Sequence, residues 1–375
     1  MASKSRYSIT QGTRIIMIIL WWAPFLLPGC NKDSPEAPFV PYSWETGSPS
    51  EAGMDERMLD SAFIAASQKG YVDGLLIVRY GKIIGEQYYN GFSEEHPHNI
   101  MSVSKSMLSA IFGMAYYGDY GLDLDDRMLD YFPEYVTDEL NQRKYEITIE
   151  HLLTMRMGIE NEAANDYGVY SDLYDSPNWI KSTIEYPLVS EPGWQMNYNT
   201  FITHLLSGII TRATGQSTYE FSYEQLFKPM GIDIDSWEQD PQGIYFGGNS
   251  MYVTPREMAV FGLLYLNRGA LDGKQIIPAD WVEYSLKPST YFFHPNQWGT
   301  WQNYNYASLW WLGQFNGYDS FLGYGYGGQF VIVFPGLELI VVSTSKYRVS
   351  PEATNQQEWG IFELVTRYIL PSLAS

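Results

Sequence analysis

Ser102 and Lys105 stand three residues apart in the stretch NIMSVSKSMLSAIFGM, which covers residues 99–114. The apolar residues after Ser102 predict a helix that begins near this serine, so both side chains would share one helix face. A serine hydroxyl becomes a nucleophile when a neighbouring base removes its proton, and a lysine is such a base only when it is neutral. The pattern therefore predicts a nucleophilic serine with a lysine as its proton acceptor.

A neutral lysine needs an apolar environment, because burial disfavours the charged ammonium. Moving the pKa of a lysine from about 10.4 to about 7 costs roughly 4–5 kcal/mol, at about 1.36 kcal/mol per unit. The spacing alone is a weak signal, since Ser343 and Lys346 repeat it after the apolar run 339–342, where we expect the end of a strand. The surrounding sequence must therefore show whether Ser102 and Lys105 are catalytic residues or share this spacing by chance.

Hydrophobic patterning places strands near both ends of the chain. Residues 74–89 form two apolar runs around Gly81-Lys82, and residues 327–345 form two more around Pro335-Gly336. Each pair of runs predicts a β-hairpin. A helix is predicted after Met54, and an amphipathic helix over 357–370 closes the chain.

Between these ends, residues 102–247 have a mostly helical pattern, with Thr148 capping one helix that would end at Gly158. Thr254, Pro255 and Glu257 have the pattern of a capping box that opens another helix. The predicted fold class is therefore α+β, an α/β sandwich. An antiparallel sheet built from both chain ends would be flanked by the terminal helices and carry an inserted helical lobe.

The first 29 residues have the pattern of a signal peptide, with a basic start and an apolar run over 15–27. The run ends in LPGC, whose cysteine, Cys30, is the single cysteine of the chain. This box resembles the bacterial lipoprotein signal, although an ordinary secretory signal with a chance cysteine is the alternative. We expect an exported protein with a lipid anchor at Cys30, a proline-rich tether over 30–50 and a folded domain over 51–375.

Composition excludes several other classes. The net charge of −20 opposes nucleic-acid binding, which needs a basic surface. The five histidines form no H-E-x-x-H motif, and the chain has no G-x-S-x-G elbow and no P-loop or dinucleotide fingerprint. These absences argue against a zinc hydrolase, an α/β-hydrolase triad and nucleotide-dependent chemistry, and we expect no metal or cofactor.

Longer segments resemble the penicillin-recognising serine hydrolases, in particular the class C β-lactamase-related branch with its esterases and aminohexanoate-oligomer hydrolases. SVSKS, at 102–106, is similar to the nucleophile motif of that family. The similarity extends in the expected order through LDLDDRMLDYFPEY, ITIEHLLTM, EPGWQMNYNTFITHLLSGIITRATG, VTPREMAVFGLLYLNRG and YGYGGQF. The resemblance implies a β-lactamase/penicillin-binding-protein-like fold.

The resemblance also assigns roles to residues. It implies that Ser102 is the nucleophile, Lys105 its base partner and Tyr198 a general acid/base whose pKa a charged lysine would lower. The N–H groups of Ser102 and Gln329 would form the oxyanion hole. Which of Lys105 and Tyr198 accepts the serine proton first stays open.

Residues implied to bind substrate are Thr200, Tyr326, Gly327 and Gly328. Thr200 replaces an asparagine of the family motif, and Tyr326 replaces a lysine or histidine. Because a neutral phenol does not attract a carboxylate as a fixed charge does, we expect an esterase or amidase and not a true β-lactamase or D-Ala-D-Ala peptidase.

A non-catalytic alternative uses the same fold as a surface lipoprotein that binds a peptide or glycan. Its binding residues would be loop aromatics that could equally be packing residues, namely Tyr167, Tyr170, Tyr174, Trp179 and Trp194. An intact Ser102, Lys105 and Tyr198 set favours the enzyme, since a binding protein has no need of a buried lysine.

Overall fold

The structure, a computed structural model, describes residues 39–289 and 296–373. Cys30, the expected signal peptide and the first part of the expected tether lie outside the described residues. The last part of that tether is not extended away from the domain, because the N–H of Tyr42 donates to the Gly231 carbonyl at 3.1 Å. The folded unit begins at Phe39 and not at residue 51.

An antiparallel sheet of eight strands, in the order β2-β1-β13-β12-β11-β10-β9-β8, occupies one half of this unit. The strands are β1 (Val72–Arg79), β2 (Lys82–Tyr88), β8 (Gln297–Trp298), β9 (Trp301–Tyr306), β10 (Trp311–Phe315), β11 (Tyr318–Gly325), β12 (Gln329–Phe334) and β13 (Leu339–Ser345). β1 pairs with β13, so that Leu76 lies opposite Val342. The prediction of a sheet assembled from both chain ends is confirmed.

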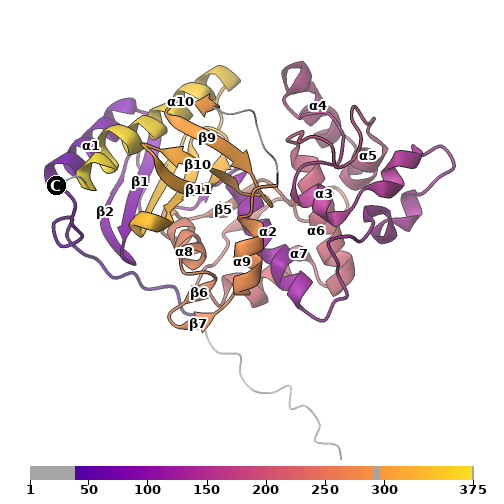
Figure 1. Ribbon diagram of the computed structural model, residues 1–375, viewed down its shortest axis with the longest axis horizontal. Helices are drawn as coiled ribbons and strands as arrows, with labels where there is room; N and C mark the ends of the chain where they lie inside the picture. Colours follow the sequence, from indigo (N-terminus) through magenta and orange to yellow (C-terminus); the bar gives the residue numbers. More distant parts are fainter. Residues whose placement is uncertain (1–38, 290–295, 374–375) are drawn as a thin grey trace, which may run out of the picture. The chain divides into compact units, whose positions relative to one another are not determined.

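Helices cover both faces of the sheet. α1 (Glu56–Lys69) and α10 (Pro351–Leu364) lie side by side on one face (Figure 1), and α10 continues into the single turn η6 (Val365–Ile369). The opposite face packs against α2 (Val103–Tyr117) and α8 (Pro255–Leu266), and α9 (Ala279–Ser285) packs against α2. Side chains of a strand alternate between faces, so Leu75 joins the core under α1 whereas Leu76 joins the core under α8.

Local capping interactions define the ends of these helices. Asp55 caps α1 by accepting a hydrogen bond from the Met58 N–H at 3.1 Å, and Gly70 ends the helix with φ of +68°. Thr254 and Glu257 form the predicted capping box of α8. These helices present continuous apolar faces to the sheet, which is what anchors them.

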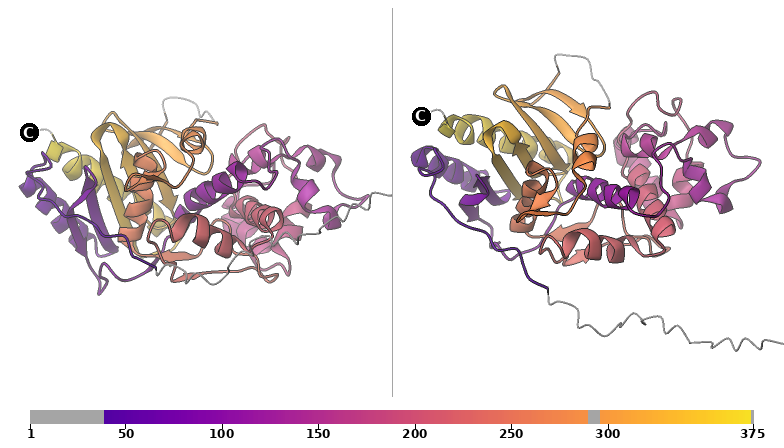
Figure 2. Two further views of the ribbon diagram at one scale, coloured as in Figure 1. Left: turned by 90° about the horizontal axis from the view of Figure 1, so that it is seen from below. Right: turned by 60° about the horizontal axis from the view of Figure 1, so that its bottom comes forward.

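The helical lobe gathers at one end of the sheet in all three views (Figures 1 and 2). Its helices are η1 (Met128–Tyr131), η2 (Pro133–Tyr135), η3 (Gln142–Glu146), α3 (Ile149–Leu153), α4 (Ala164–Tyr174), α5 (Trp179–Glu185), α6 (Thr200–Thr214), α7 (Thr218–Ser222) and η4 (Tyr223–Phe227). α3 begins at its predicted cap, Thr148, but ends at Leu153 and not at Gly158.

Short strands and turns complete the unit. A small sheet of β3 (His98–Asn99), β5 (Met251–Val253) and β4 (Ser236–Trp237) joins the segment before α2 to the end of the lobe. The remaining elements are β6 (Ala270–Leu271), β7 (Lys274–Gln275), η5 (Pro335–Leu337) and η7 (Pro371–Leu373). No helix in the described part of the chain is long and apolar enough to cross a lipid bilayer.

Candidate active site

Ser102 occupies the N-terminal cap position of α2, where the small sheet, the lobe and strand β11 meet. The preceding residue, Met101, has φ of +50°, a strained conformation for a residue with a side chain. The Asn99 side chain holds this turn by accepting a hydrogen bond from the Met101 N–H at 2.9 Å. The sharp turn leaves Ser102 half-buried at the wall of a cavity.

Lys105 lies one helical turn further along α2, and only 1% of it is exposed. Its Nζ donates to Ser102 Oγ at 2.8 Å, to Thr200 Oγ1 at 2.9 Å and to the Gly248 carbonyl at 2.8 Å. The predicted proximity of serine and lysine is confirmed. When Lys105 is neutral, its two N–H groups can stay on Thr200 and Gly248, which directs the lone pair at Ser102 Oγ.

Burial lowers the pKa of Lys105 to about 8, and the carboxylate of Glu162 partly opposes this shift. A normal lysine is charged in almost all molecules at pH 7, whereas about a tenth of the Lys105 side chains are neutral there. The enclosure of this amine therefore provides a base within hydrogen-bonding distance of a hydroxyl.

Tyr198 faces the same centre from the loop before α6, with its ring centroid 5.0 Å from Lys105 Nζ. Two buried asparagines flank it and hold the loop. Asn197 donates to the Ile159 carbonyl at 2.8 Å, and Asn199 donates to the Glu160 carbonyl at 3.1 Å. The structure thus brings Ser102, Lys105 and Tyr198 together from segments almost one hundred residues apart in the chain.

The expected fall in the pKa of Tyr198 is wrong in direction. Burial and the nearby Glu162 carboxylate raise the pKa of this phenol well above its usual value, and a hydrogen bond from Ser102 only partly offsets them. Desolvation of a phenolate outweighs attraction to a lysine that is itself partly neutral. Tyr198 is therefore a protonated donor in the resting site.

Thr200 is among the lining residues of a hollow beside Ser102, and its polar groups already have partners within the protein. Its Oγ1 accepts the hydrogen bond from Lys105, and its N–H donates to the Glu162 carboxylate at 2.6 Å. Only 1% of the residue is exposed. Its observed contacts are those of a residue that positions the lysine.

The turn between β11 and β12 contains the other residues expected to bind substrate. Tyr326 lines the cavity, and its hydroxyl donates to the Val349 carbonyl at 3.0 Å. Gly327 and Gly328 have φ of +80° and +94°, and a Cβ on Gly327 would lie 2.8 Å from the Lys346 carbonyl oxygen. The backbone turn and its contact with the segment after β13 require glycine at these positions.

Gln329, expected to supply an oxyanion N–H, does not line the cavity. It is the first residue of β12, pairs with Gly325 and is fully buried, with its side-chain amide hydrogen-bonded to the backbone of Ser345. Among the hydrogen bonds of the described residues, the backbone N–H groups of Ser102 and Tyr326 have no acceptor. These two free donors flank the cavity wall.

The cavity beside Ser102 has a volume of about 390 Å³ and mostly aromatic walls. Its aromatic lining residues are Tyr167, Tyr198, Trp298, Trp301, Tyr304, Trp311, Tyr324 and Tyr326. Two carboxylates, Glu162 and Glu358, also line it. A second hollow that contains Ser102, lined by residues such as Asp166 and Tyr170, continues on the other side of the serine.

Sequence reasoning missed both carboxylates. Glu162 follows no motif, and it reaches the site because residues 155–162 are hydrogen-bonded to the loop that carries Tyr198. The position of Glu358 in the sequence did contain a signal that could have identified it. It lies on the buried face of α10 with Thr354, Ile361 and Phe362, where an acidic residue is unusual.

The loop aromatics that the sequence offered as either binding or packing residues differ in their positions. Tyr167 lines the cavity, and Tyr170 and Tyr174 line neighbouring hollows. Trp179 is a packing residue with 3% of its surface exposed, whereas 80% of Trp194 is exposed and it lines none of these hollows. Only part of the aromatic set is thus placed to contact a substrate.

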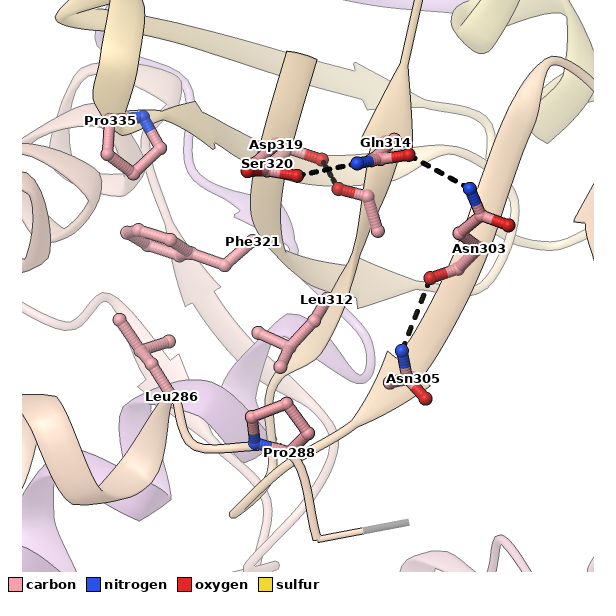
Figure 3. Close-up of a pocket in the computed structure, with 11 residues that line it drawn as sticks. Leu286, Pro288, Asn303, Asn305, Leu312, Gln314, Asp319, Ser320, Phe321 and Pro335 are labelled. Atoms are coloured by element: carbon pink, nitrogen blue, oxygen red, sulfur yellow. Dashed lines mark hydrogen bonds between the residues drawn. The ribbon is translucent and has the colours of Figure 1, made fainter. Parts of the chain in front are cut away.

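A separate cavity of about 540 Å³ lies over β9, β10 and β11 (Figure 3). Its polar side chains bond to one another, as Asn303 donates to Gln314 at 2.9 Å and Gln314 donates to Asp319 at 2.8 Å. It contains neither a lysine nor a histidine, and its one hydroxyl, on Ser320, donates to the Gly313 carbonyl. Within the described residues, no three His, Cys, Asp or Glu side chains are grouped as a metal site.

An antiparallel sheet with helices on both faces, an inserted helical lobe and a Ser-Lys-Tyr centre between them define the β-lactamase/penicillin-binding-protein-like class of serine hydrolases. Residues 59–365 match the sequence profile of the Beta-lactamase family. The chain belongs to this family and is a serine hydrolase.

Individual proteins show the same relationship. A 6-aminohexanoate-dimer hydrolase of Paenarthrobacter ureafaciens is 25% identical over 73% of this chain and 72% of its own. The octameric penicillin-binding protein homologue of Pyrococcus abyssi has a TM-score of 0.63 at 18% identity, covering 85% of this chain and 78% of its own. EstCE1, a hydrolase with promiscuous acyltransferase activity, has a TM-score of 0.65 at 16% identity, covering 83% and 99%.

The pKa of Lys105 predicts the pH dependence of turnover. If the neutral amine is the base, kcat/KM for an uncharged ester should rise about tenfold per pH unit below pH 8 and level off above it. The measurement is initial rates from pH 5.5 to 9.5, with thermal stability recorded at each pH as a control. A profile that is flat or falling between pH 6 and 8 would contradict this role.

Proposed function

We propose that the protein hydrolyses esters or amides through an acyl-enzyme on Ser102. The observation that carries this proposal is the enclosed Lys105 amine, 2.8 Å from Ser102 Oγ and held by two further acceptors. A 6-aminohexanoate-dimer hydrolase among the relatives, and a structural neighbour with acyltransferase activity, support acyl transfer.

In the first half of the reaction, Lys105 accepts the Ser102 proton as Oγ attacks the carbonyl carbon of the substrate. The carbonyl oxygen becomes an oxyanion, and the bond to the leaving group breaks as a proton returns to that group. Tyr198 is placed to relay this proton, since its phenol is protonated and lies beside both Ser102 and Lys105. In the second half, water attacks the acyl-enzyme, gives up a proton to the same centre and releases the acid.

For the oxyanion we propose the N–H groups of Ser102 and Tyr326. Both are free of backbone acceptors and belong to residues that line the cavity, unlike Gln329. Ser102 also lies at the N-terminus of α2, where the helix dipole favours a negative charge. Such preorganised donors stabilise charge that develops only in the transition state.

The first test is removal of the nucleophile. Ser102→Ala should lower kcat/KM for a p-nitrophenyl ester by at least about 10³-fold, because no acyl-enzyme can form. Its Tm should stay close to that of the wild type, since Ser102 makes no cap hydrogen bond with its side chain. Ser109→Ala, on the same helix and away from the cavity, is the matched control and should remain active. Turnover retained in Ser102→Ala would eliminate this nucleophile.

We further propose a preference for uncharged esters or amides over carboxylate-bearing β-lactams. The described residues that line the cavity include no lysine, arginine or histidine, and Tyr326 stands where the family has a cation. Arg348, another candidate for binding a carboxylate, is exposed and lies over the Tyr347 ring. Glu162 and Glu358 would also repel an anion.

This preference is measured as the ratio of kcat/KM for a neutral ester to that for a chromogenic cephalosporin. A missing charged hydrogen bond is worth about 1.5–3 kcal/mol, or roughly 10–150-fold. Tyr326→Lys should narrow the ratio and Tyr326→Phe, the matched control, should not. A wild-type enzyme that hydrolyses the cephalosporin faster would overturn this preference.

For location, we propose an exported protein anchored to a membrane by a lipid on Cys30, facing the periplasm or the cell surface. The support is the apolar run that ends in LPGC, and the fact that the chain has no other cysteine. An acyl anchor followed by a proline-rich segment would hold the catalytic unit near the membrane surface.

Metabolic labelling with a fatty acid tests this location. The wild type should incorporate the label and partition with membranes, whereas Cys30→Ala should do neither. Ser109→Ala again serves as a control, since its leader is intact. Equal labelling of the wild type and Cys30→Ala, or no labelling of either protein, would exclude the lipoprotein proposal.

A further inference from the structure

Glu358 is a buried acid for which the described part of the chain supplies no cationic partner. It lies on α10, 3% exposed, and lines the cavity beside Ser102. Its carboxylate accepts hydrogen bonds from the Tyr324 hydroxyl at 2.5 Å and from the Gly327 N–H. No lysine, arginine or histidine of the described residues pairs with it, and burial raises its pKa to about 7.

A purely structural role does not require this charge. Of the three donors against this carboxylate, namely the Tyr324 hydroxyl, the Gly327 N–H and the Trp298 indole N–H, a glutamine oxygen would still accept from Tyr324 and Gly327 without placing an acid on the buried face of α10. A buried carboxylate is stabilised by a cation, and the protein supplies none at this position in its described part. An acid at this position therefore points to a positively charged group that arrives with a ligand and holds the carboxyl group in its charged form.

Aromatic rings surround the same space. Trp311 lies 6.0 Å from Tyr324, and Trp301 stacks on Tyr304 at 4.9 Å, both measured between ring centroids. The faces of indole and phenol rings are negative and attract organic cations, above all when water is excluded. Because Glu162 is a second acid on the cavity wall, every side chain among the described lining residues that carries a formal charge is acidic.

We propose that this cavity selects esters or amides that carry an ammonium group, bound by Glu358 and the rings of Trp311, Tyr324 and Tyr304. The inference rests on the proposed hydrolysis at Ser102 and names the substrate class for that site. A cavity of about 390 Å³ is large enough for a trimethylammonium group on a short chain.

Paired substrates that differ only in charge test the proposal. One pair places the charge on the acyl side, with p-nitrophenyl 4-(trimethylammonio)butyrate against p-nitrophenyl 5,5-dimethylhexanoate. The other places it on the alcohol side, with choline butyrate against 3,3-dimethylbutyl butyrate. In at least one pair, the cationic ester should have a kcat/KM at least about tenfold higher, mainly through a lower KM.

Glu358→Gln should reduce that cationic-to-neutral ratio to about one, because it removes the charge and keeps the hydrogen-bond acceptor. Glu363→Gln is the matched control. It makes the same charge change on the same helix, at a residue that pairs with Lys69 and Arg367 outside the cavity. It should keep the wild-type ratio, which separates local binding from attraction by the net charge of −20.

A binding measurement separates this inference from the proposed hydrolysis. Choline should raise the Tm of the Ser102→Ala protein, whereas 3,3-dimethylbutanol should not, and adding Glu358→Gln should abolish the shift. The inference would be overturned if the neutral esters are hydrolysed, the cationic-to-neutral ratios of kcat/KM are near one and choline does not raise the Tm. The proposed hydrolysis at Ser102 would still stand in that case. A shift by choline without turnover of any ester would instead support the cation site and count against the proposed hydrolysis.

Discussion

The site depends on the exclusion of water from one amine. Lys105 can accept a proton near neutral pH because α2, the end of the lobe and the residues before α6 enclose it, and two of its hydrogen-bond partners, Thr200 and Gly248, lie far from it in the sequence. If that enclosure opened, water would solvate the ammonium and the pKa of Lys105 would return toward its usual value. The contact between sheet and lobe is thus a catalytic requirement as well as a packing one.

The same enclosure places one unfavourable group on the cavity wall and another behind Ser102. A partly neutral lysine and a buried acid, Glu358, both lower the stability of the empty protein relative to apolar replacements. The cores on the two faces of the sheet offset this, since β1, β12 and β13 are almost fully buried between helices. Stability is concentrated in the sheet, and destabilising groups are concentrated where ligands bind, as expected for a functional site.

Local signals in the sequence were sufficient for most elements. Asp55 and Thr254 define helix starts through side-chain caps, and the turns at Gly81 and Pro335 separate strands that pair with their neighbours. The expected tether was wrong near Tyr42 because proline-rich composition does not reveal a backbone hydrogen bond to a residue as distant as Gly231. The early end of α3 at Leu153 had the same origin, in a loop held by contacts with the segment around Asn197.

At the site, the sequence by itself determined that the Ser102 and Lys105 side chains are neighbours, because both residues lie at the start of one helix and their spacing is a local property. Tertiary structure decided the state of each group. It raised the pKa of Tyr198 where a lowered value was expected, withdrew Gln329 into a strand and brought Glu162 and Glu358 to the cavity. The physical reason is that desolvation and charge pairing depend on atoms close in space, and the atoms around this cavity come from segments spread between residues 99 and 358.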